Sequence, residues 1–172
     1  MAITYKKRRL ENGLLGRYFN LYFQDNMGSL TSPGTVVVNT SISSYSVDTT
    51  DTWLFRGYFL ADTTSTQWRF RTTSDDASWL WVGSNSTAAD TSLNTSNAAV
   101  NNGGAHSSRT RTSGNLSLTS GVFYPIAVVV GNNTGPGILT VEFSSNGGTT
   151  WNATGTGYYF YNPYAPNGYN LE

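Results

Sequence analysis

Residues 67–82 constrain the fold most, because they contain two runs of alternating side chains. Aromatic positions alternate with basic ones in residues 67–73, and tryptophans alternate with other apolar residues in residues 78–83. A two-residue period places successive side chains on opposite faces of a β-strand. The first run therefore predicts a half-buried strand, and the second predicts a strand covered on both faces. The opposed faces are Trp68 and Phe70 against Arg69 and Arg71, then Trp79 and Trp81 against Leu80 and Val82.

The polar residues 74–77 separate these two runs and are of the kind that reverses a chain. We therefore expect a β-hairpin with Asp75 and Asp76 at its tip. No other position in the sequence places two acidic residues side by side, so the tip is a candidate functional site.

The rest of the chain repeats the pattern of short strands and turns. Gly or Ser interrupts every stretch that might form an amphipathic helix. We expect an all-β domain, a β-sandwich or barrel of antiparallel strands with long surface loops at residues 24–52 and 84–104. The other expected strands are residues 13–20, 53–60, 122–130, 138–143 and 158–161.

Composition narrows the possible partners. Ten basic and ten acidic side chains cancel, and only 12% of residues are charged, so the chain lacks the basic surface that nucleic acids require. The chain has no cysteine, which excludes disulfides and thiolate metal sites. Aromatic residues make up 14% of a sequence rich in Ser, Thr, Asn and Gly, and such a polar, uncharged surface suits sugars.

The start of the chain has charges but no apolar stretch after them, so it does not read as a secretory signal. No other segment is apolar enough to insert into a membrane. We expect a virion or extracellular surface location reached by an unknown route, although an intracellular protein or a fragment of a larger one would look similar.

Residues 1–12 carry a basic run in a chain with few charges, ahead of a domain at residues 13–172. This N-terminal arm is a candidate for docking on a neighbouring structural subunit, although such runs often only solvate a chain end. The basic residues are Lys6, Lys7, Arg8 and Arg9.

Three stretches together carry a family resemblance: Gly13-Leu-Leu-Gly-Arg-Tyr-Phe, the run from Trp68 to Gly83, and Gly121-Val-Phe-Tyr-Pro-Ile followed by Gly131-Asn-Asn. Their order and spacing, over residues 13–162, resemble the fourteen-kilodalton protective-antigen domain family and its GLEYA-type relatives in yeast flocculins and adhesins. The resemblance implies a β-sandwich or barrel that binds glycans.

In the sugar-binding branch of that family, two consecutive aspartates joined by a cis peptide bond hold Ca²⁺ together with a later asparagine. The resemblance assigns these roles to Asp75 and Asp76, with Asn132 or Asn133 as the asparagine. Ca²⁺ prefers six to eight oxygen ligands, so positions would remain for vicinal sugar hydroxyls. An acidic pair at a turn can also arise because Asp favours turns.

We expect sugar contacts at Asn132 and Thr134, and a possible stack of a pyranose on Trp79 or Trp81. The apolar neighbours of both tryptophans equally favour a place in the core.

We expect no enzymatic activity. His106 is the sole histidine and lies in a polar stretch, which does not favour a nucleophilic triad. Two carboxylates that share one ion would also be too close to flank a glycosidic bond. Two hypotheses remain: a calcium-dependent lectin-like module for adhesion or host recognition, and a structural bacteriophage protein, such as a capsid decoration or tail component, that uses the fold as a scaffold.

Overall fold

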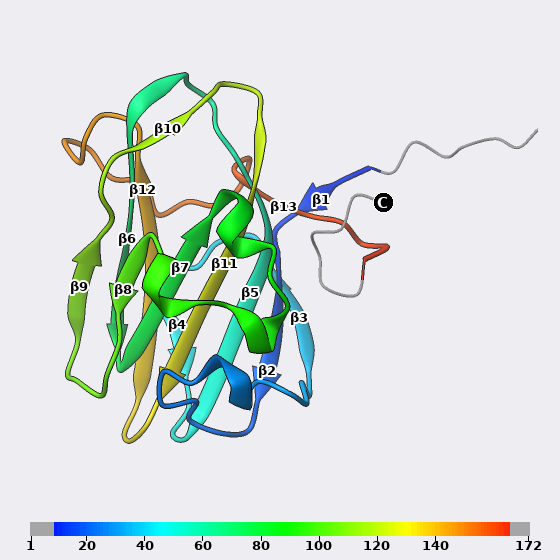
Figure 1. Cartoon of the computed structure of the whole chain (residues 1–172), viewed down its shortest axis with the longest axis vertical. Helices are drawn as coiled ribbons and strands as arrows, with labels where there is room; N and C mark the ends of the chain where they lie inside the picture. The colour runs from blue at the N-terminus through cyan, green and yellow to red at the C-terminus, as the bar shows by residue number, and fades with distance from the viewer. Residues whose placement is uncertain (1–8, 166–172) are drawn as a thin grey trace, which may run out of the picture.

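The structure is a computed structural model that describes residues 9–165. Within this range the strands form two antiparallel sheets of eight and five strands, which face each other as a β-sandwich (Figure 1). The all-β fold expected from the sequence is confirmed, in its sandwich form.

The large sheet has the order β1 (Glu11–Asn12), β13 (Tyr159–Tyr161), β5 (Asp51–Leu60), β11 (Phe123–Asn132), β7 (Ala77–Val82) and β8 (Val100–Asn102). In the same sheet, β2 (Leu14–Phe19) pairs with both β5 and β3 (Val36–Asn39). The small sheet has the order β10 (Leu116–Leu118), β6 (Ser65–Asp75), β12 (Gly137–Ser144) and β4 (Tyr45–Val47), with β9 (Arg109–Thr112) also paired to β6.

Helical structure in the described part of the chain is limited to four short 3₁₀ segments. They are η1 (Met27–Ser29), η2 (Gly83–Ser86), η3 (Asp90–Ser92) and η4 (Thr95–Asn97). No helix among these residues has the length and apolar character needed to cross a bilayer.

The main hydrophobic core lies between the two sheets. Trp68 and Phe70 of β6 point into it and meet the ring of Phe59 of β5 at centroid distances of 5.3 and 4.9 Å. Leu80 of β7 and Val128 of β11 belong to the same core. The faces predicted from the alternation in residues 67–82 are therefore confirmed.

A second core covers the outer face of the large sheet. Trp79, Trp81 and Val129 point outwards from β7 and β11, and loop side chains such as Phe23 and Leu93 pack over them. Figure 1 shows the loops before and after η1, and those that carry η2 to η4, lying across this sheet. β7 is consequently buried on both faces, as its apolar composition predicted, and β11 is buried in the same way from Ile126 to Asn132.

The expected hairpin between residues 67–73 and 78–83 is wrong. β6 continues to Asp75 in the small sheet and pairs with β12, whereas β7 begins at Ala77 in the large sheet and pairs with β11. A single residue, Asp76, therefore joins the two sheets. The physical reason is burial: β7 is apolar on both faces and needs a central position, whereas β6 has a basic face that suits a sheet with one solvated side.

A buried ion pair fixes the long loop between β7 and β8 to the large sheet. Arg56 of β5 is fully buried, and its Nε lies 2.8 Å from Oδ1 of Asp90. Its guanidinium also donates to the backbone carbonyls of Ser86 and Ala88. Arg17 of β2 donates to the same Asp90 carboxylate at 2.7 Å. One carboxylate thus connects two strands with the loop that carries η2 to η4.

Two features of the chain's start bear on the expected N-terminal arm. Glu11 and Asn12 pair with β13, so the sheet begins before the domain boundary expected at Gly13. Arg9 is exposed, while Lys6, Lys7 and Arg8 lie outside the described residues. Docking by this arm stays a prediction.

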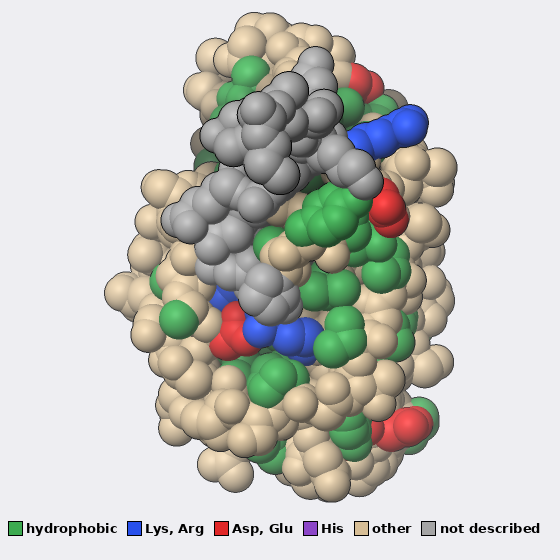
Figure 2. All heavy atoms as spheres, turned by 90° about the vertical axis from the view of Figure 1, so that its right-hand side faces the viewer, with side chains coloured by type: hydrophobic (Ala, Val, Ile, Leu, Met, Phe, Trp, Pro, Cys, Tyr) green, Lys and Arg blue, Asp and Glu red, His purple; other side chains and the backbone are tan. Residues whose placement is uncertain are grey.

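The edge strand β3 exposes two apolar side chains, Val36 and Val38, at 53% and 46% of their surface. It lies on the right-hand side of Figure 1, the side that faces the viewer in Figure 2, where hydrophobic side chains reach the surface beside basic and acidic ones.

Asp90→Asn should lower the free energy of unfolding by about 3 kcal/mol, because it leaves the buried Arg56 cation without its counter-charge. Urea denaturation measures the change. The matched control is Glu142→Gln, which breaks the more exposed Arg71–Glu142 pair and should cost less than about 1 kcal/mol. Equal losses in the two variants would contradict this account of the loop.

Candidate functional site

Four segments meet at one end of the sandwich, the lower end in Figure 1. They are the β6–β7 corner at Asp76, the β11–β12 loop at residues 133–136, the loop between β2 and η1, and the β8–β9 loop at residues 103–108. Hydrogen bonds connect the corner with the β8–β9 and β11–β12 loops, and the β2–η1 loop with the β8–β9 loop. The two consecutive acids singled out in the sequence therefore lie among loops that are held to one another.

Asp76 is the centre of these contacts. Its carboxylate accepts hydrogen bonds from two backbone amides, His106 N at 2.6 Å on Oδ1 and Asn133 N at 2.8 Å on Oδ2. The side chain is 6% exposed. The peptide bond between Asp75 and Asp76 is cis, the form that the family resemblance implied. One carboxylate thus connects the corner to the β8–β9 and β11–β12 loops.

Asn132, at the end of β11, is fully buried beside this corner. Its Nδ2 donates to the carbonyls of Val47 and Gly135 at 3.2 and 2.6 Å, which orients the amide. Its Oδ1 is buried without a hydrogen-bond partner within the described chain. A buried acceptor without a donor is costly, so this oxygen is the atom at the site that most needs a ligand.

Gly137 allows the approach of Asn132 to the acidic pair. A Cβ at this glycine would lie 2.7 Å from Cγ of Asn132 and 2.8 Å from the backbone oxygen of Asp75. Any larger residue would therefore push the amide and the Asp75 backbone apart. The glycine therefore lets the amide of Asn132, at the end of β11, and the backbone oxygen of Asp75, at the end of β6, both approach the start of β12.

A buried polar network supports the corner between the sheets. Ser74 Oγ donates to the backbone oxygen of Asp76 at 2.7 Å and contacts Ser78 Oγ at the same distance. Asn102 of β8 donates to Ser74 Oγ, and its Oδ1 accepts from Arg109 Nε of β9. Hydrogen bonds thus take the place of hydrophobic packing at this end, and they fix the backbone of the corner from the interior of the sandwich.

Asp25 and Tyr22 also belong to this end, although sequence reasoning did not select them. Asp25 accepts hydrogen bonds from Trp79 Nε1 at 2.9 Å and from Gly104 N at 2.7 Å. Burial and the negative charges of Asp25 and Asp76 raise the pKa of Tyr22 to about 12, so this half-buried phenol lies close to both acids. The only signal in the sequence is a mixed aromatic and acidic stretch inside a polar loop.

Asp25 also lines a hollow of about 450 Å³ beside the site. Its other walls come from residues 26–28 and 91–95, which belong to the loops that cover the large sheet.

The remaining sequence-selected residues differ in accessibility. Asn133 and Thr134 are exposed in the β11–β12 loop. Trp79 is 6% exposed and Trp81 is fully buried, with its Nε1 donating to the carbonyl of Asn94. This burial favours the core role for both tryptophans, and their contact with a sugar stays a prediction.

The donor set at the corner fits a hard cation. Carboxylates, an amide oxygen and main-chain carbonyls are the ligands that Ca²⁺ prefers. The unpartnered Asn132 Oδ1 provides an acceptor that a cation would satisfy. No group of three or more His, Cys, Asp or Glu side chains among residues 9–165 could hold a metal ion, so amide and carbonyl oxygens would have to complete any shell.

The GLEYA domain family model matches residues 52–145, slightly more than half of the 172-residue chain. No curated protein sequence matches the chain.

Solved structures share the fold. The PA14 domain of the antifreeze protein MpAFP has a TM-score of 0.70 at 14% identity, and the match covers 96% of this chain and 100% of that one. The A domain of epithelial adhesin 6 from Candida glabrata, in complex with Galb1-3GlcNAc, has a TM-score of 0.69 at 14% identity, covering 88% of each chain.

An anti-sigma factor domain-containing protein from Clostridium clariflavum has a TM-score of 0.65 at 20% identity. The match covers 88% of this chain and 47% of that one, so this chain spans about half the length of that protein. At such identities the likeness establishes the fold.

Asp25→Ala should lower the free energy of unfolding by about 2 kcal/mol, because the Trp79 and Gly104 donors lose a charged acceptor. Amide hydrogen exchange at Gly104 should also become faster. Urea denaturation and exchange measured by NMR test the two effects. Asp48→Ala, which removes an exposed aspartate, should change neither quantity; an unchanged exchange rate at Gly104 in Asp25→Ala would refute the connection between the loops.

Proposed function

The chain belongs to the GLEYA domain family, and from this premise we propose that it is a calcium-dependent carbohydrate-binding module for adhesion or host recognition, displayed on a cell surface or a virion. We propose that the module binds glycans and does not catalyse a reaction on them.

The observation that carries the proposal is the Asn132 side chain. Its Oδ1 is buried and unpartnered, while its Nδ2 is held by two carbonyls, so the acceptor is fixed in place before any ligand arrives. The oxygen belongs to the same end as Asp75 and Asp76, and Gly137 leaves room for both the Asn132 amide and the Asp75 backbone. A cation there would satisfy the orphan acceptor and be neutralised by the two carboxylates.

The residues of the chain divide the task. Asp76 is held by the amides of His106 and Asn133, and each of its oxygens keeps a further lone pair for a cation. Asp75 and Asn132 supply the second carboxylate and the amide oxygen, and the exposed side chains of Asn133 and Thr134 are available to a ligand. When bound, Ca²⁺ supplies open coordination positions for vicinal sugar hydroxyls.

Side chains around the acidic corner provide the other contacts with the glycan. Tyr22 is half-buried next to Asp25 and Asp76, so its ring can contact a sugar face while its hydroxyl stays protonated at neutral pH. The epithelial adhesin 6 domain was solved with Galb1-3GlcNAc, which makes galactosides the first glycans to test.

Calcium should stabilise the protein. At about 100-fold above Kd, binding adds about 2.7 kcal/mol to the free energy of unfolding, which for a domain of this size raises Tm by roughly 5–10 °C. Thermal unfolding with EDTA and with increasing CaCl₂ measures the shift. Asp75→Asn should reduce this calcium-dependent rise in Tm without disturbing the loops, because the hydrogen bonds to the loops are made by Asp76.

The matched control is Asp62→Asn, which removes one exposed negative charge from the turn between β5 and β6, at the opposite end of β6 from Asp75. It should keep the calcium shift, whereas an equal loss in both variants would point to general charge attraction. Binding of lactose and Galb1-3GlcNAc, measured by calorimetry, should need calcium and an intact Asp75.

If neither Tm nor glycan binding responds to calcium, the lectin proposal fails. The scaffold account, a bacteriophage structural protein docked through Lys6, Lys7, Arg8 and Arg9, would then be the one to test.

A further inference from the structure

The edge strand β3 has a free side that is both apolar and exposed. In the part of the chain that the structure describes, β3 pairs with β2 and with no other strand (Figure 1). Its exposed residues Val36 and Val38 share one face, whereas the Val37 side chain points to the other face and lies near Gly16. The strand therefore offers apolar surface beside an unpaired edge.

The backbone groups of Val36 and Val38 point to this free edge. The Tyr18 amide of β2 donates to the backbone oxygen of Thr35 at 3.0 Å, so Thr35 turns its backbone groups towards β2. Successive residues of an antiparallel strand turn these groups to alternate sides. Val37 therefore faces β2 again, and Val36 and Val38 face outwards. The same two residues present donors, acceptors and apolar side chains along one edge.

β3 lacks the features that protect edge strands from pairing with another chain, which are charges, prolines and bulges. No charged residue lies between Asp25 and Asp48 in the sequence, and Pro33 precedes the strand. The register between β3 and β2 is continuous, without a bulge. The strand β9 differs, because its four residues include Arg109 and Arg111. β3 is therefore open to association through its backbone.

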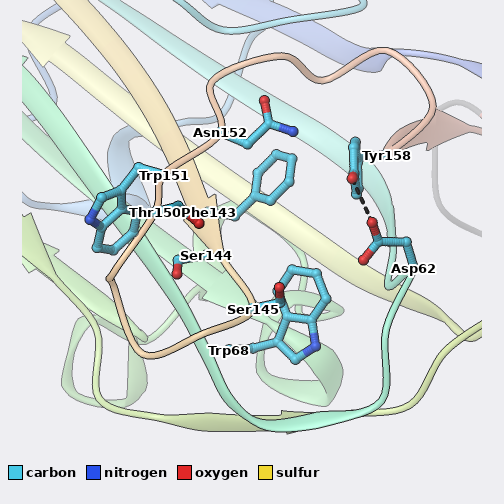
Figure 3. A pocket seen from close by; sticks show the side chains of 9 residues that line it. All are labelled: Asp62, Trp68, Phe143, Ser144, Ser145, Thr150, Trp151, Asn152 and Tyr158. Atoms are coloured by element: carbon cyan, nitrogen blue, oxygen red, sulfur yellow. Dashed lines mark hydrogen bonds between the residues drawn. The ribbon is translucent and has the colours of Figure 1, made fainter.

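Aromatic groups elsewhere near the described surface pack against one another. Figure 3 shows Trp68, Phe143 and Tyr158 grouped at a hollow where β6 begins and β12 ends. The rings of Phe143 and Tyr158 lie 4.6 Å apart, and Trp68 and Phe143 are 1% and 3% exposed. The partly exposed ring of Phe123 lies 5.2 Å from that of Phe160. β3 differs from these groups because its exposed side chains stand beside an unpaired backbone.

The sequence Val36-Val37-Val38 is symmetric about its centre, so it can pair with its own copy. When two copies align antiparallel with Val37 opposite Val37, Val36 of each copy faces Val38 of the other. Both residues have outward backbone groups, so each facing pair exchanges two backbone hydrogen bonds and joins two exposed valines. A two-fold interface requires such self-complementary surface. We propose that β3 docks on β3 of a second copy of this chain, which joins their large sheets into one.

The short length of β3 limits the affinity. Its four residues span about 13 Å, at about 3.3 Å per residue. We expect a contact along this edge to bury less than the roughly 1,200 Å² at which standard protein–protein interfaces begin. A Kd on the order of 0.1–1 mM follows. Where many copies are held on one surface, effective concentrations reach the millimolar range, and such an affinity is then sufficient for pairing.

Dilution of the full chain, followed by ¹H–¹⁵N NMR in EDTA and without sugar, tests the pairing. Protein concentrations of about 0.02–2 mM bracket the expected Kd. The amide resonances of Val36 and Val38 should shift with a saturable dependence on concentration, and the translational diffusion coefficient should fall as the concentration rises. The proposal is overturned if neither amide shifts over this range.

Two double variants test the register, because position 36 of one copy faces position 38 of the other. Val36→Lys with Val38→Lys places like charges opposite each other and should weaken self-association at least tenfold, on the order expected for two repelling pairs. Val36→Lys with Val38→Glu places opposite charges there and should keep the Kd within about threefold of the parent. Both variants change exposed positions, so both should fold.

The matched control is Val122→Lys, at an exposed valine that lies before β11 and outside β3. It should self-associate as the parent does. Unchanged affinity in the variant with two lysines, or an equal loss in both double variants, would also overturn the proposal. The measurements need neither calcium nor glycan, so either outcome leaves the lectin proposal untouched.

Discussion

The two backbone amides that donate to the Asp76 carboxylate hold together the end of the sandwich that carries the acidic pair. His106 and Asn133 belong to loops from opposite sides of the corner, and each loop connects a strand of the large sheet to one of the small sheet. Because β6 and β7 are joined by Asp76 alone, the carboxylate sits where the two sheets are tied most closely. The position of the exposed Asn133 follows from this arrangement, so the fold supplies a base on which the loops of this end are held.

The faces of the strands could be read from the sequence, but their partners could not. Alternation placed Trp68 and Phe70 inside and identified β7 as buried on both sides, because a two-residue period reports directly on the two faces of a strand. Alternation says nothing about which sheet a strand joins, and so the polar residues 74–77 suggested a hairpin instead of a passage between sheets. The acidic pair stood out in the sequence itself, as the one place with two neighbouring acids, whereas the asparagine loop was found through a family resemblance. Asp25 and Tyr22 were missed, because a loop residue's neighbours are set by tertiary contacts that leave no period in the sequence.

Proteins that share this fold carry names as different as an antifreeze protein, an epithelial adhesin and an anti-sigma factor domain-containing protein. The sandwich itself therefore says little about activity, and function must be argued from the site. The end that holds Asp75, Asp76 and Asn132 offers oxygens with excess negative charge, one of them buried and unpartnered, and this chemistry suits a cation.

The burial of the Arg56–Asp90 pair has a consequence for the surroundings in which the protein can work. Dissolved ions weaken attraction between exposed charges, with a screening length of about 8 Å at physiological ionic strength, but they act far less on charges out of contact with water. The Arg56 side chain is fully buried and that of Asp90 is 14% exposed. The ion pair that attaches the loop carrying η2 to η4 is therefore weakened little by added salt. Residues 91–95, beside Asp25, should keep their position as ionic strength rises.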